Sequence, residues 1–125
     1  MDYIIIAVKV IIFISIINVW FIRFNKKTTF RGGDASSMKA EFATYGLSET
    51  MVYLIGTLKV LSALSLLLSI WIPSLALPAA SVMAFLMLGA IFMHFKIKDS
   101  LLKSLPAFIF LLLSLLIISY SYYEV

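Results

Sequence analysis

Four polar side chains lie inside one long apolar run, where few chemical roles are open to them. Lys59 stands in the middle of YLIGTLKVLSALSLLLSIW, residues 53–71, and Ser62, Ser65 and Ser69 follow it. In a helix the three serines fall on one side of Lys59 and form a polar strip. A lysine near the middle of a bilayer is unfavourable by several kcal/mol and usually faces other helices together with a partner. The strip therefore predicts an inward-facing surface, on which Lys59 either binds an anionic group or is hydrogen-bonded to serines.

A second candidate site lies in the third apolar run. Six residues there are spaced alternately four and three apart, which places them on one helix face: Ala76, Ala80, Met83, Met87, Ala90 and His94. Small residues allow helices to approach closely and methionines fill irregular space. The face is typical of a packed helix seam. It also suits the flexible apolar wall of a ligand pocket, with His94 at the mouth.

Lys9 lies about 9 Å inside the first apolar run. Its ammonium group either reaches the external interface or faces the bundle interior, where it would join the candidate ligand-binding residues. No nucleophile with a base beside it, no pair of carboxylates and no glycine-rich phosphate loop accompanies these residues. The sequence has no cysteine and one histidine, which makes a poor metal site. We therefore predict no metal and, in the absence of a visible catalytic set, favour a protein that is not an enzyme.

Four apolar segments must position these side chains. Of the 125 residues, 63% are hydrophobic and 13% are charged, whereas a soluble domain has about a quarter charged residues. The runs at 3–24, 49–71, 75–95 and 105–122 have the length that crosses a bilayer as a helix. We predict an all-α fold, in which residues 1–125 form a single membrane domain built as a transmembrane four-helix bundle.

The basic residues indicate how the bundle is oriented. Eight of them lie at or in the first and third loops, while the second loop and the C-terminal tail have none: Arg23, Lys26, Lys27, Arg31, Lys39, Lys96, Lys98 and Lys103. The positive-inside rule then places these loops in the cytoplasm and both termini outside. Orientation and attraction to anionic lipid head groups account for the net charge of +4, so we predict a lipid bilayer and no nucleic acid as partner.

The loop at 25–48 contains a short amphipathic segment. Met38, Phe42 and Tyr45 follow one another at i, i+4 and i+7, which makes one apolar stripe. Asp34 can cap the start of this helix and Gly46 its end. We predict a short interfacial helix that lies on the inner leaflet between the first two spans.

Two carboxylates flank this segment. Glu41 is either solvated at the membrane interface or a partner for a cationic group beneath the loop. Ser48 is placed to cap the second span, and Glu49 in its first turn suits the helix dipole. Glu41 and Tyr45 are accordingly predicted to be interfacial residues.

Three stretches, RGGDASSMKAEFATYGLS, YLIGTLKVLSALSLLLSIWIPSLALPAA and LMLGAIFMHFKIKDSLLKSLPA, resemble the DoxX-like family. The resemblance implies a four-helix bundle in a bacterial inner membrane. It implies little about activity, because the relatives include a subunit of a thiosulfate:quinone oxidoreductase as well as proteins of cargo export. A quinone cofactor is possible only by this analogy. Many members carry a glutamate where this chain has Lys59, so a role that rests on that glutamate does not transfer.

Two hypotheses of function follow. In the first, a non-enzymatic binding or assembly protein holds a lipid-like or small anionic ligand, or docks a partner helix. Its candidate binding residues are Lys59, Ser62, Ser65, Ser69, Met83, Met87, His94 and Lys9. In the second, the chain is an accessory membrane subunit of a quinone-linked oxidoreductase, by family analogy alone. Either protein could act with a membrane partner or as a homo-oligomer.

Overall fold

The computed structural model describes residues 3–124, with side chains placed for residues 3–122. It is all-helical, with elements in the order α1 (Tyr3–Ile17), η1 (Asn18–Ile22), α2 (Met38–Thr44), α3 (Glu49–Leu68), η2 (Pro73–Leu75), α4 (Ala76–Lys96) and α5 (Leu101–Glu124). Four helical stretches are long and apolar enough to cross a membrane: Tyr3–Ile22, Glu49–Leu68, Pro73–Lys96 and Leu101–Tyr122. The predicted all-α fold with four spans is confirmed.

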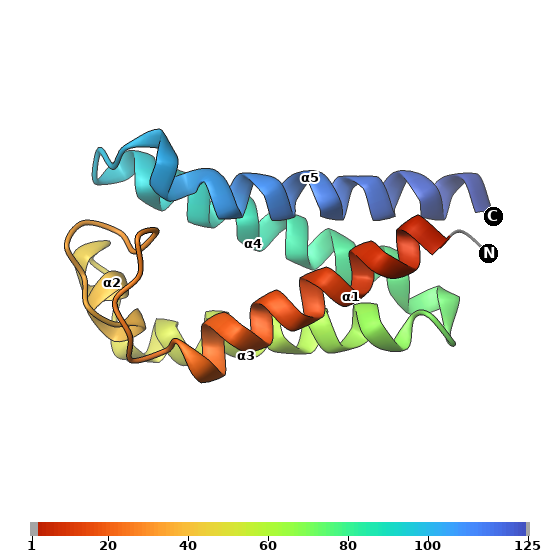
Figure 1. Ribbon diagram of the computed structural model, residues 1–125, viewed down its shortest axis with the longest axis horizontal. Coiled ribbons are helices and arrows are strands. Elements are labelled where there is room, and N and C mark those ends of the chain that lie inside the picture. Colours follow the sequence, from red (N-terminus) through yellow and green to blue (C-terminus); the bar gives the residue numbers. More distant parts are fainter. Residues whose placement is uncertain (1–2, 125) are drawn as a thin grey trace.

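The four long helices form two pairs that are close together at one end of the molecule and apart at the other. α1 runs beside α3, and α4 runs beside α5 (Figure 1). α1 approaches α5 near the end where both chain ends lie, and it diverges from α5 towards the opposite end, where the α2 segment is found (Figure 1). The bundle therefore has a closed end and a wider end.

The closed end contains a buried hydrophobic core. Ile12, Leu66, Met83 and Ile117, one from each long helix, are fully buried there. Many large hydrophobic side chains on the outside of the same helices are exposed, among them Ile14, Leu61 and Phe85. Such an exposed apolar surface is what a bilayer covers, since helices in lipid have no need to bury their outer faces.

Residues 24–48 cover the wider end. Ser37 caps α2 by accepting the Ala40 N–H at 3.1 Å, so the cap predicted at Asp34 is wrong by three residues. Gly46 ends the segment with φ +82°, the left-handed conformation predicted for it. Ser48 begins α3 as predicted, because its hydroxyl accepts a backbone N–H of the first turn at 3.4 Å.

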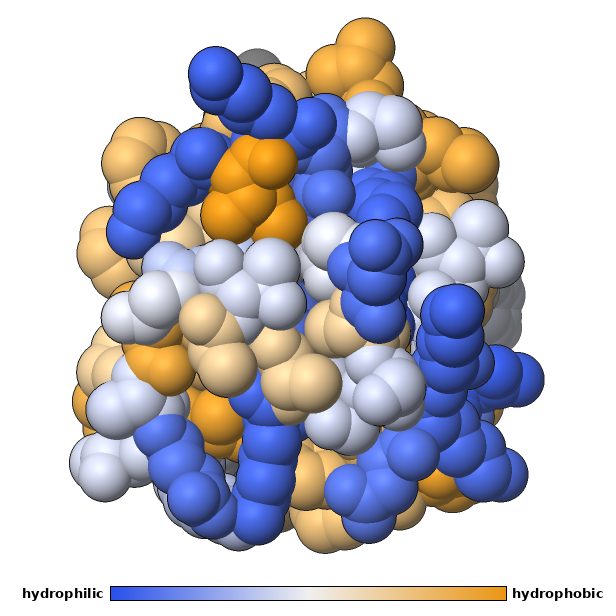
Figure 2. Space-filling view, turned by 90° about the vertical axis from the view of Figure 1, so that its left-hand side faces the viewer, coloured by the Kyte–Doolittle hydropathy of each residue, from blue (hydrophilic) through white to orange (hydrophobic). Residues whose placement is uncertain are grey.

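The apolar stripe of α2 faces the bundle. Met38, Phe42 and Tyr45 are all buried and belong to the main hydrophobic cluster. Phe42 meets the Trp20 ring edge-on, with the ring centres 6.1 Å apart. The stripe expected to lie on lipid instead covers the space that the diverging helix pairs leave open. Polar side chains of the loops are then gathered on the outer surface of this end (Figure 2).

Candidate functional site

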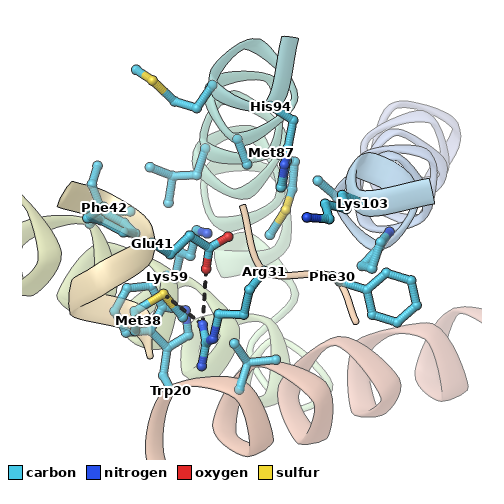
Figure 3. Close-up of a pocket in the computed structure, with 18 of the residues that line it drawn as sticks. Trp20, Phe30, Arg31, Met38, Glu41, Phe42, Lys59, Met87, His94 and Lys103 are labelled. Atoms are coloured by element: carbon cyan, nitrogen blue, oxygen red, sulfur yellow. Dashed lines mark hydrogen bonds and ion pairs between the residues drawn. The ribbon is translucent and has the colours of Figure 1, made fainter. Parts of the chain in front are cut away.

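A cavity of about 1010 Å³ lies beneath the α2 segment at the wider end. Apolar side chains from all four long helices line it, including Val19, Ile55, Met87, Ala90 and Phe110. This volume is at the upper limit of ordinary ligand pockets, which measure about 300–1,000 Å³. Charged and titratable side chains reach the cavity from the first loop and from each of α2, α3, α4 and α5, and they converge on one region of it (Figure 3).

A local change of helix type brings Trp20 into this cavity. After Ile17 the first span continues as one π-helical turn, in which the Arg23 N–H donates to the Asn18 carbonyl at 2.9 Å. Such π turns shift the helix face and are frequent at functional sites. The Trp20 ring lies against α3 at Gly56, where an added Cβ would be 2.5 Å from the ring. The close approach of ring and helix therefore requires a glycine.

Lys59 lies one helical turn after Gly56 and contacts the same ring. Its Nζ is 5.5 Å from the centre of the Trp20 ring, within the range of a cation–π interaction. Among the described side chains, no carboxylate forms an ion pair with Lys59. The ammonium group of Lys59 is thus held by an aromatic face at the wall of the cavity (Figure 3).

Arg31 and Glu41 form a buried ion pair above the cavity. Nη1 of Arg31 lies 3.0 Å from Oε2 of Glu41, and the Arg31 side chain is only 4% exposed. The guanidinium also donates to the carbonyl oxygens of Arg23 and Lys26 at the end of the first span. Glu41 accepts two more hydrogen bonds, from the Gly32 N–H at 3.0 Å and from the Tyr45 hydroxyl at 2.7 Å. The Glu41 carboxylate therefore accepts from three donors, all of them within residues 31–45.

Tyr45 continues this network to α4. Its hydroxyl oxygen is 3.4 Å from Nε2 of His94, and the two rings meet edge-on with centres 5.7 Å apart. Burial and the negative charge of Glu41 raise the pKa of Tyr45 far above its usual range. The hydroxyl consequently stays protonated and remains a donor to Glu41.

His94 is held on its other side by Asp99. Nδ1 of His94 and Oδ2 of Asp99 are 2.7 Å apart, and because a carboxylate only accepts, Nδ1 carries a hydrogen. Lys98 adopts the left-handed conformation (φ +58°) after α4, and the Asp99 N–H returns to the His94 carbonyl at 2.9 Å. This turn places the Asp99 carboxylate beside the imidazole. Asp99 also accepts from the Gly33 N–H at 3.0 Å, which ties the first loop to the third.

Two lysines complete the connection between these loops. Lys96 Nζ donates to the Tyr45 carbonyl at 3.2 Å, and Lys103 Nζ donates to the Gly33 carbonyl. Lys103 Nζ also lies 3.8 Å from Oδ1 of Asp99. The segment 24–48 is therefore fixed to α4 and α5 by side chains from both helices, and it closes the cavity from above.

The face of α4 that the sequence singles out has two different environments. Ala76, Ala80 and Met83 are buried in the packed half of the bundle. Met87, Ala90 and His94 continue the same stripe along the cavity wall. The first half of the stripe is thus a packed helix seam, whereas the second half lines a cavity.

The strip on α3 reaches the cavity only at Lys59. Ser62 and Ser69 are buried and Ser65 is partly buried, all in the packed half of the bundle. Ser69 donates to the Leu66 carbonyl at 2.5 Å, so its hydroxyl is engaged within the helix. The three serines and Met83 face inward as expected, but none of them lines the cavity beside Lys59.

Lys9 and the two residues predicted to be interfacial, Glu41 and Tyr45, are all buried within the protein. Lys9 is 7% exposed and faces the bundle in its packed half, away from the cavity. Glu41 and Tyr45 are buried and line the cavity. Of the alternatives left open for Glu41, the structure shows pairing with a cation, and that cation is Arg31.

Three residues of the site were not predicted from the sequence as site residues. Trp20 is typical of an aromatic belt, and Arg31 of an orientation-setting loop. Asp99 is a single carboxylate in a short turn. The signal that could have found Asp99 is its spacing of five from His94, across a helix end.

The fold and the site together define a small multi-pass membrane protein with four spans and a cavity at one end of its bundle. A model of the DoxX-like family matches residues 27–117, and the chain belongs to this family. No curated protein and no solved structure matches the chain. The match covers the α2 segment, α3, α4 and most of α5, which supply most of the cavity wall. Among the described residues, no group of His, Asp and Glu side chains is arranged to hold a metal ion.

Proposed function

We propose that this protein binds a lipid-like molecule in the cavity at the wider end of its bundle and does not catalyse a reaction. The observation that carries the proposal is the cavity itself, about 1010 Å³ in volume, with apolar walls and a cluster of charged side chains at one place. An amphiphile fits both parts, because its chain is covered by the apolar walls and its head group meets the charges.

The surroundings support a ligand that arrives through the membrane. The cavity is lined by Val19 of the first span and by Phe110 of the last, the two helices that diverge at this end (Figure 1). The segment above the cavity is fixed by the ion pair of Arg31 and the hydrogen bonds of Gly33. An occupant therefore has an easier route between helices than through the loop.

We place the cavity in the cytoplasmic half of a bacterial inner membrane, with both termini outside. The support for this orientation is the set of basic residues in the loops at the wider end, together with the positive-inside rule. Labelling of single cysteines introduced at Lys27 and at Ser74 tests it. Only the cysteine at position 74 should react with an impermeant thiol reagent in intact cells.

Native mass spectrometry of the protein from native nanodiscs tests ligand binding. We expect a discrete additional mass on the wild-type protein. Ala90→Phe fills the cavity and should remove this mass. Val82→Phe adds the same ring to the lipid-exposed side of the same helix and should retain it. An unliganded protein in every preparation would contradict the proposal and would favour docking of a partner helix.

A quinone is the second candidate occupant, and one observation favours it. The carbonyl oxygens of a quinone accept hydrogen bonds, and Lys59 presents a donor next to the face of Trp20, against which a flat ring can stack. Chromatography of the extracted ligand with redox difference spectroscopy separates this candidate from a lipid. A quinone found in amounts equal to the protein would favour the accessory role in a quinone-linked oxidoreductase.

A further inference from the structure

We infer that the ligand carries a single negative charge on its head group and that Lys59 is its counter-ion. This inference rests on the proposed function and specifies the chemical class of the ligand. Two kinds of lipid-like molecule have such a head group, a long-chain carboxylate and a phosphodiester lipid. In both, the single negative charge lies on oxygen atoms.

The first step is the charge at the cavity. Five basic side chains line it and one carboxylate does, in addition to His94: Arg23, Lys27, Arg31, Lys59 and Lys103 against Glu41. Two of these cations have a carboxylate of their own. Arg31 is paired with Glu41 at 3.0 Å, and Lys103 has Asp99 at 3.8 Å. Neither cation therefore needs a ligand for its neutralisation.

The second step separates the remaining cations by their solvation. Arg23 and Lys27 are exposed in the loop, where water and lipid head groups surround them. Lys59 lies inside a span and is partly buried, with its exposed part at the cavity wall. Of the cations that line the cavity within the described chain, Lys59 is the one left both unpaired and removed from bulk water.

The third step concerns the groups around Lys59. The Glu41 carboxylate lies near Lys59 (Figure 3), but its ion pair is with Arg31, and its oxygens already accept from Arg31, Gly32 and Tyr45. The Trp20 ring attracts the ammonium but carries no net charge. An uncompensated charge at this depth is costly, so an anion in the cavity is stabilised by Lys59 and stabilises it in return. One unpaired cation matches one negative charge.

A set of probes that differ only in head-group charge tests the inference. We would measure binding of hexadecanoate, hexadecanol and hexadecylamine to the intact protein in phosphatidylcholine nanodiscs, with phosphatidylglycerol as a competitor in a separate arm. The expected result is that hexadecanoate binds at least about tenfold more tightly than hexadecanol, and the amine more weakly than either. Competition by phosphatidylglycerol would assign the anion to a phosphodiester lipid as well as to a free carboxylate.

Variants assign the preference to Lys59. Lys59→Leu should bind the acid and the alcohol equally, and Lys59→Arg should retain the preference for the acid. Lys9→Leu is the matched control, since it removes a buried lysine outside the cavity and should leave the preference unchanged. If Lys59→Leu does not fold, the comparison of acid and alcohol on the wild-type protein decides the charge of the ligand, and Lys59→Gln, which keeps a polar side chain without the charge, decides whether Lys59 is the counter-ion.

The outcomes separate the two proposals. Equal binding of acid and alcohol by the wild-type protein would overturn the inference about charge and leave a lipid-binding cavity in place. A preference that survives in Lys59→Leu would also overturn it. Failure of all probes, neutral ones included, would contradict the proposed function together with the inference.

Discussion

Nζ of Lys59 lies 5.5 Å from the centre of the Trp20 ring, and this contact joins the second span, α3, to the π-helical end of the first span. The ring reaches α3 because Gly56 has no side chain. One helical turn separates Gly56 from Lys59, so the glycine that admits the ring also determines where the ammonium group rests. The same face of α3 thus packs closely against the Trp20 ring at Gly56 and places the charge of Lys59 over that ring.

Gly56→Ala should disrupt this contact. The added methyl would lie 2.5 Å from the Trp20 ring, so the ring or the helix must move, and overpacking of this kind destabilises by about 1–3 kcal/mol. We expect a lower midpoint of thermal unfolding and a changed fluorescence of Trp20. Gly89→Ala is the control, because nothing lies within 4 Å of the position of its Cβ. There the better helix propensity of alanine should raise stability by up to about 1 kcal/mol. Equal effects of the two substitutions would contradict the packing requirement.

Arg31→Gln should destabilise the loop strongly. The substitution leaves the buried Glu41 carboxylate without its cation, and removal of one partner from a buried ion pair costs about 3–5 kcal/mol. Protease cleavage after the exposed Lys26 and Lys27 should become faster as the segment loosens. Lys39→Gln removes the exposed pair with Glu49 (2.8 Å) and should change little, since surface ion pairs contribute little. The double variant Arg31→Met with Glu41→Met should recover part of the loss. Wild-type cleavage rates in Arg31→Gln would show that the pair does not hold the loop.

The contact of Asp99 with His94 should make stability depend on acidic pH. Burial alone would raise the pKa of Asp99, but hydrogen bonds from His94 and Gly33 and the charges of His94 and Lys103 outweigh it and hold the pKa below the usual 3.8. A carboxyl whose pKa is lowered on folding contributes stability above its unfolded pKa and loses it as pH falls through the folded value. Thermal unfolding midpoints of the wild-type protein should therefore fall below about pH 4 more steeply than those of Asp99→Asn. If the unfolding midpoints of the wild-type protein and of Asp99→Asn fell equally with pH, the Asp99 carboxylate would not contribute to this pH dependence.

Much of the fold could be predicted because two constraints act on it at once. A span must be about 20 residues long, and all of its backbone N–H and C=O groups must be hydrogen-bonded within the protein. Length and composition therefore define the four helices. The stripe from Ala76 to His94 follows from a period of 3.6 and is confirmed as an inward face. The caps at Gly46 and Ser48 follow from local backbone chemistry. Each of these features depends on neighbours in the sequence.

The candidate site depends on contacts between distant segments, and the sequence alone could not decide them. Met38, Phe42 and Tyr45 form the same stripe whether lipid or protein covers it, so the pattern does not distinguish a surface helix from one that fills the bundle. The contact of Asp99 with His94 requires Lys98 in the left-handed conformation, for which no glycine gives a signal. The sequence predicts that Lys59 faces the bundle interior. Its contact with Trp20 depends on the π-helical turn that begins at Asn18, and no residue pattern predicts that turn.

Tyr45→Phe should weaken the link between the first loop and α4. The Tyr45 hydroxyl donates to Glu41 at 2.7 Å and contacts His94 at 3.4 Å, and burial together with Glu41 keeps its pKa raised, so it serves as a donor throughout the ordinary pH range. Its removal takes one of three donors from a buried carboxylate, which costs about 1–3 kcal/mol. Hydrogen exchange of the backbone amides at 31–45 should accelerate, while that of α5 stays as in the wild-type protein.

Tyr53→Phe serves as the control for this change. Tyr53 is 53% exposed on α3, and its ring lies 5.5 Å from Nζ of Lys39 on the outer surface. Loss of its hydroxyl should leave both stability and exchange nearly unchanged, because the hydroxyl interacts with the exposed pair of Lys39 and Glu49, and surface contacts of this kind contribute little. Unaltered exchange at 31–45 in Tyr45→Phe would mean that the other hydrogen bonds and the ion pair of this segment hold it without the tyrosine hydroxyl. Faster exchange confined to 31–45 would show that the tyrosine hydroxyl stabilises the first loop.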